Sequence, residues 1–175
     1  MSLPLHPAIV HLPIGGAVLG LPLAIAILLM VWNGAPRRTW LLAALVQTLG
    51  LGGALFALNT GETMEELVED EVPEAKIEAH EAHAQRFAAG LGLSAALMFA
   101  AAFAPGRFAR AADGAAVAAA GLALGLALPT GHTGGLMVYG DEEVVQQDTT
   151  LPRKFAAAGG DENSRRSLVM AEVSA

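Results

Sequence analysis

The chain has 175 residues, of which 54% are hydrophobic and only 15% are charged. This composition is too apolar for an ordinary soluble domain of this length, and it predicts an integral membrane protein. The net charge of −7 argues against nucleic acid as a partner, and the lack of cysteine excludes disulfides, iron–sulfur clusters and covalently attached c-type haem.

Four apolar segments follow one another along the chain, at about residues 8–32, 39–58, 87–104 and 111–128. Each approaches the roughly 20 residues that a helix needs to cross a bilayer. The sequence therefore predicts an all-α fold, an integral membrane four-helix bundle. The expected organisation is a transmembrane domain over residues 1–140, followed by a polar tail over residues 141–175.

Arginines cluster in the two short connections of this predicted bundle. Arg37 and Arg38 separate the first two segments, and Arg107 and Arg110 separate the last two. Because cytoplasmic loops are enriched in arginine and lysine, both connections are expected in the cytoplasm. The N- and C-termini of a multi-pass protein in a bacterial inner membrane are then expected to be periplasmic.

The connection between the second and third segments is acidic and is expected to be helical and periplasmic. Residues 62–71 form its acidic part, and Pro73 suits the start of a new helix that continues into the third span. After the fourth segment, residues 130–135 predict a glycine-rich turn.

All five histidines of the chain are expected at the periplasmic edge of this bundle: His6, His11, His80, His83 and His132. Histidine is the commonest side-chain metal ligand, and a polar ring at membrane depth usually has a specific partner. Four-helix bundles commonly hold cofactors between facing helices. We therefore expect a metal or haem site at this edge.

The motifs around the histidines are His6-Pro7-Ala8-Ile9-Val10-His11-Leu12-Pro13-Ile14 at the start and Thr130-Gly131-His132-Thr133-Gly134-Gly135 after the fourth segment. With these motifs the chain resembles, over about residues 3 to 140, the bacterial four-span membrane family called domain of unknown function 2231. The resemblance implies the four-span fold and its topology. It implies no activity, because the family label names none.

The favoured interpretation is a b-type cytochrome-like subunit that binds one or two haems b near the periplasmic face. His11 and His83 are the preferred axial ligands, with His80 and His132 as further candidates and Arg86 as a candidate partner of a haem propionate. Such a subunit would pass electrons between a membrane carrier, such as a quinol, and a periplasmic c-type cytochrome. We expect an electron-transfer subunit rather than a stand-alone enzyme.

Two alternatives stay open. Three or more of the histidines, with His6 among the candidates, could hold zinc or copper in place of haem, and the spacing of His80 and His83 suits such a site. The other alternative is a structural subunit of a respiratory complex, in which the histidines only form hydrogen bonds.

Overall fold

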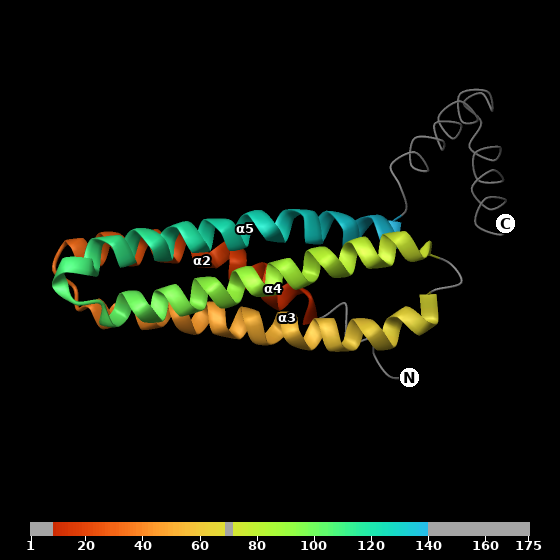
Figure 1. Ribbon diagram of the computed structural model, residues 1–175, viewed down its shortest axis with the longest axis horizontal. Coiled ribbons are helices and arrows are strands. Elements are labelled where there is room, and N and C mark those ends of the chain that lie inside the picture. The colour runs from red at the N-terminus through yellow and green to blue at the C-terminus, as the bar shows by residue number, and fades with distance from the viewer. Residues whose placement is uncertain (1–8, 69–71, 140–175) are drawn as a thin grey trace, which may run out of the picture. The chain divides into compact units, whose positions relative to one another are not determined.

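Four long helices make up the part of the chain that the computed structural model describes, which is residues 9–68 and 72–139, with the backbone alone at 62–68, 138 and 139. The helices are α2 (His11–Trp32), α3 (Trp40–Val68), α4 (Glu74–Phe103) and α5 (Ala109–Tyr139), with short 3-10 turns η1 (Arg37–Thr39) and η2 (Gly106–Phe108) before α3 and α5. Figure 1 shows the four helices. The chain divides into two units, Met1–Gly135 and Leu136–Ala175, and the packing described below belongs to the first.

All four helices are long and apolar enough to cross a membrane, which confirms the predicted four-span, all-α class. Large apolar side chains are exposed on every helix, for example Leu19, Leu42, Phe99 and Leu128. In a soluble domain such a surface would be a liability, whereas in a bilayer it contacts lipid tails.

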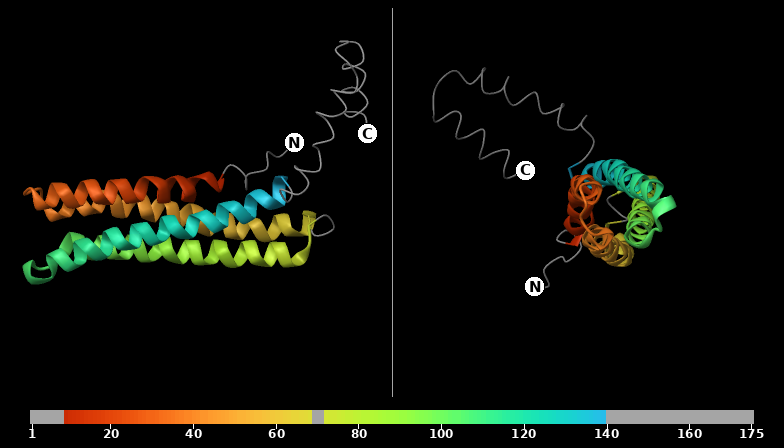
Figure 2. Two further views of the ribbon diagram at one scale, coloured as in Figure 1. Left: turned by 90° about the horizontal axis from the view of Figure 1, so that it is seen from above. Right: turned by 90° about the vertical axis from the view of Figure 1, so that its left-hand side faces the viewer.

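The helices alternate in direction and pack around a common interior. In the end-on view of Figure 2 they follow one another around the bundle in chain order, so that α2 and α4 lie diagonally opposite. Leu21 of α2 approaches Gly121 of α5, which closes the ring. One end of the bundle, here called the arginine end, carries the two short connections. The other, the histidine end, carries the start of α2 and the connection from α3 to α4.

Small residues let the helices approach closely, as is common in the packing of membrane-spanning helices. A Cβ atom on Gly16 would lie 3.2 Å from the Cα atom of Gly50 on α3, and one on Gly90 would lie 3.5 Å from the Cα atom of Ala123 on α5. The buried core is rich in alanine, and it includes the large side chains Trp40 and Met98. These close contacts set the register of the helices.

The expectation of a glycine-rich turn after the fourth span is wrong, because α5 continues as a helix to Tyr139. The hydroxyl groups of Thr130 and Thr133 donate to the carbonyl oxygens of Leu126 and Pro129, four residues earlier, at 2.9 Å each. Such bonds are compatible with continued helix. By contrast, α4 begins at Glu74, directly after Pro73, as the sequence predicts.

Candidate functional site

The histidine end brings together four of the five histidines. His11 begins α2, His80 and His83 lie in the first third of α4, and His132 lies near the end of α5. Antiparallel packing therefore places all four near one end of the bundle. His6 lies outside the described residues.

His80 is half-buried and held by a hydroxyl group of the neighbouring helix. Its Nδ1 atom lies 2.9 Å from Oγ1 of Thr133, and its ring lies against Gly134, where a Cβ atom would be only 3.0 Å from Cε1. Because the Thr133 hydroxyl donates its proton to the carbonyl of Pro129, its oxygen accepts from Nδ1–H of His80. Thr133 thus holds the His80 ring through its Nδ1 atom. A histidine that ligates a metal is commonly oriented in this way through its other nitrogen.

The helical spacing places His83, like His80, on the side of α4 that faces α5. It lies seven residues, or two helical turns, before Gly90, which packs against Ala123 and Leu126 of α5. The ring is half-buried, yet it makes no hydrogen bond or ion pair with any residue that the structure describes. A polar ring at this depth without a protein partner is a candidate for binding something external.

His11 and His132 lie on exposed sides of their helices. The buried stripe of α2 runs through Pro13, Gly16 and Ala17, and His11 lies on the side opposite to it. Moreover, His11 and His83 belong to the diagonally opposite helices α2 and α4 (Figure 2). The structure thus does not bring this pair of rings face to face across the interior.

No group of three or more histidine, aspartate or glutamate side chains gathers at one point among the residues that the structure describes. Arg86, one turn after His83, is exposed and forms no ion pair within that part of the chain. Glu81 accepts a hydrogen bond of 2.8 Å from Gln85. Arg86 is therefore a positive charge one turn from His83 that has no ion-pair partner in the described part of the chain.

At the arginine end the structure shows a second polar site, which centres on Asp113 of α5. The side chain of Asp113 is only 1% exposed, and its Oδ1 atom lies 2.7 Å from a terminal nitrogen of Arg37. Its Oδ1 also accepts from the indole N–H of Trp40 at 2.9 Å, and its Oδ2 from Arg37 at 3.2 Å and from Trp32 at 3.3 Å. Arg37 further donates to the carbonyl oxygens of Ala101 and Ala109. The carboxylate of Asp113 on α5 thus accepts hydrogen bonds from residues of α2, η1 and α3.

The predictions made from the sequence did not include this site, although a signal was present. Asp113 is an acidic residue at the start of an otherwise apolar span, and ionisable residues within spans usually pair with one another. The nearest opposite charges at the same membrane edge are the arginines of the two connections. That both tryptophans bond to the carboxylate is a tertiary feature, since their sequence positions alone suggest only interfacial anchors.

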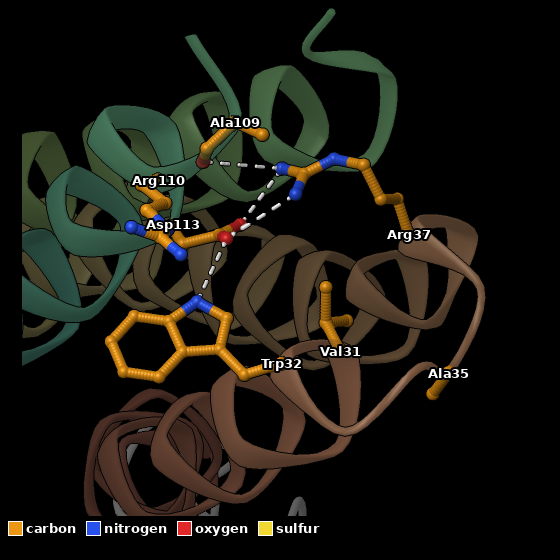
Figure 3. Close-up of a pocket in the computed structure, with 7 residues that line it drawn as sticks. All are labelled: Val31, Trp32, Ala35, Arg37, Ala109, Arg110 and Asp113. Carbon is orange, nitrogen blue, oxygen red and sulfur yellow. Dashed lines mark hydrogen bonds and ion pairs between the residues drawn. The ribbon is translucent and has the colours of Figure 1, made fainter. Parts of the chain in front are cut away.

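A cavity of about 660 Å³ opens beside the Asp113 site. Figure 3 shows the carboxylate between the guanidinium group of Arg37 and the indole of Trp32, with Arg110 on the same wall. The lining residues are Val31, Trp32, Ala35, Arg37, Ala109, Arg110 and Asp113. The cavity therefore combines an apolar side with two guanidinium groups.

The middle of the bundle holds a third polar feature. Gln47 of α3 and Ser94 of α4 are fully buried. The Nε2 and Oε1 atoms of Gln47 and the Oγ atom of Ser94 have no hydrogen-bond partner among the described residues. Gly20 of α2 makes room for Gln47, because a Cβ atom on Gly20 would overlap Nε2 at 2.1 Å. The polar atoms of both side chains are thus enclosed in an otherwise apolar interior.

Comparison with known proteins identifies one family. The family model described as "Predicted membrane protein (DUF2231)" matches residues 2–147, most of the chain. No curated protein and no solved structure matches.

Proposed function

We propose that this chain, which belongs to the DUF2231 family of predicted membrane proteins, is a b-type cytochrome-like subunit that binds haem at its histidine end. The observation that carries the proposal is His83, a half-buried imidazole that faces α5 and has no partner among the described residues. An imidazole nitrogen in this state can serve as an axial ligand of a haem iron.

Further residues of the histidine end fit a bound haem. Arg86 is exposed, unpaired within the described chain and one turn from His83, so its guanidinium is available to a propionate. The ring of His80 is oriented by Thr133 through Nδ1, as the ring of a metal-ligating histidine commonly is. His11 and His132 stay candidates for a second ligand at the rim, because both are exposed at the same end.

Bound haem would supply one-electron redox chemistry. Oxidation of a quinol in the membrane releases two electrons and two protons, and the electrons would leave singly to a periplasmic c-type cytochrome or another subunit of a respiratory complex. We place the histidine end in the periplasm of a bacterial inner membrane because arginines occupy the connections at the other end. The acidic connection near this end would attract a basic electron acceptor.

One observation favours a second candidate, a non-haem zinc or copper site. His80 and His83 lie three residues apart, both turn toward α5, and Thr133 orients His80 as an outer partner orients a metal ligand. Two protein ligands of this kind would need further ligands from elsewhere in the chain or from a partner.

The absorption spectrum of the full chain, purified from haem-replete cells, tests the proposal. We expect a Soret band and sharpened visible bands on reduction with dithionite. His83→Ala should lose the bound haem, whereas Glu78→Ala, an exposed change on the same helix, should keep it. His11→Ala and His132→Ala then show which ring supplies a second ligand.

A colourless preparation that contains stoichiometric zinc or copper would replace the haem proposal by the metal site. A preparation with neither haem nor metal would contradict both.

A further inference from the structure

The charges around the cavity at the arginine end do not balance. Both oxygens of Asp113 are occupied, by Arg37, Trp40 and Trp32, so this carboxylate has no capacity left for another cation. Arg110 lines the same cavity but forms no hydrogen bond or ion pair with any described residue. The cavity is therefore left with one uncompensated positive charge.

The backbone adds to this positive potential. Arg110 is the second residue of α5, and the first turn of a helix is the positive end of its dipole. A cation is less favourable at that end of a helix, and an anion bound close by would offset the effect. Arg38 and Arg107 at the same end of the bundle raise the potential further, and Asp113 is already neutralised by Arg37.

The surroundings of the cavity are those of the edge of a bilayer. Trp32 is 60% exposed at its mouth, and Leu29 and Met30 are exposed on the adjoining turn of α2. Interfacial tryptophan marks the depth of lipid headgroups, and the apolar side chains below it mark the depth of acyl chains. A ligand that fits must be anionic at one end and apolar at the other.

We propose that this cavity binds the phosphate group of an anionic phospholipid, with Arg110 as the pairing residue. Trp32 and the exposed apolar side chains of α2 then contact the glycerol and the acyl chains. Basic pockets between spanning helices bind lipid headgroups by this combination of charge and apolar contact. A lipid headgroup and free phosphate both present a phosphate anion. The apolar side chains around the cavity favour the lipid as the ligand.

The test uses the full chain purified in a neutral detergent, with binding of phosphatidylglycerol measured by native mass spectrometry. Phosphatidylcholine and inorganic phosphate are the other probes. We expect preferential binding of phosphatidylglycerol over phosphatidylcholine, and an affinity for phosphatidylglycerol about fivefold lower in Arg110→Gln. The matched control is Arg107→Gln, because Arg107 stacks on Phe108 at 4.7 Å and does not line the cavity.

Circular dichroism of each variant establishes that the helices are retained. Equal losses of affinity in Arg110→Gln and Arg107→Gln would overturn the proposal, since general attraction to a basic surface would then explain the binding. Binding of inorganic phosphate that depends on Arg110, without preference for phosphatidylglycerol, would overturn the lipid as the ligand. No preference for either anion would overturn the site itself.

Discussion

Asp113 shows how one residue organises the arginine end. A buried carboxylate in an apolar bundle is tolerated only if its charge is paired and its oxygens are hydrogen-bonded. Here Arg37 supplies the charge, and the indole groups of Trp32 and Trp40 supply further donors. Removal of either charged partner therefore leaves the other in an unfavourable environment.

We predict that Asp113→Asn lowers the free energy of unfolding by about 3 kcal/mol, because Arg37 loses its counter-charge in a site that is largely buried. Denaturant titration of the protein in detergent micelles measures this change. The double variant Asp113→Asn with Arg37→Gln should recover part of the loss. Arg38→Gln, an exposed change next in the chain, should have little effect, and an equal loss there would contradict the assignment.

The two tryptophans should differ in their contributions. Trp40 is fully buried and donates to Asp113 at 2.9 Å, whereas Trp32 is 60% exposed and donates at 3.3 Å. We expect Trp40→Phe to cost about 1–3 kcal/mol, because it leaves a buried acceptor short of a donor, and Trp32→Phe to cost less. The chain has only these two tryptophans, so each variant leaves one fluorophore that reports its own unfolding. Equal losses of stability in the two variants would contradict the larger contribution of Trp40.

At the scale of the helices, neighbouring glycines have different roles. Gly16 of α2 faces the backbone of Gly50 on α3, whereas a Cβ atom on Gly15 would meet nothing within 4 Å. Close packing of α2 on α3 therefore depends on Gly16 and not on Gly15.

We predict that Gly16→Ala destabilises the bundle by about 1–3 kcal/mol, because the new methyl group meets backbone that cannot turn away as a side chain would. Gly15→Ala is the matched control and should be neutral or stabilise by up to about 1 kcal/mol, since alanine is the better helix former. Thermal unfolding in detergent compares the two. The reverse order would show that the register of α2 on α3 is different.

Inside α3, Gln47 has two buried polar atoms and no partner among the described residues. We expect Gln47→Met, which retains the approximate size of the side chain, to leave the thermal stability unchanged or to raise it, because an unsatisfied buried polar group costs about 1–3 kcal/mol. Ser94→Ala is the companion variant on α4. A clear loss of stability in both variants would indicate that buried water bonds to these side chains.

For the whole molecule, the orientation in the membrane can be measured directly because the chain has no cysteine of its own. Single cysteines at Gly106, in the arginine-end connection, and at Glu78, on the exposed side of α4, keep all arginines in place. From the positive-inside rule we expect a membrane-impermeant maleimide to label Glu78→Cys in intact spheroplasts and Gly106→Cys only in inverted vesicles. The opposite pattern would invert the topology and place the histidine end, with the haem site proposed there, in the cytoplasm.

The histidine end was predictable in its location but not in its geometry. Alternation of four spans places His11, His80, His83 and His132 at one end, and the structure has them there. Which rings face one another depends on how each helix is rotated about its axis. The hydrophobic pattern does not define that rotation here, because these helices are apolar on almost every side.

By itself the sequence determined the four spans, the all-α class and the start of α4 after Pro73, because the length of an apolar run and the backbone limits of proline are local properties. The tertiary structure decided which faces meet. Contact between Gly16 and Gly50 turns His11 outward, while contact between Gly90 and Ala123 turns His83 toward α5. The same packing brings Arg37 to Asp113, 76 residues later, and so creates a polar site that no local pattern contains.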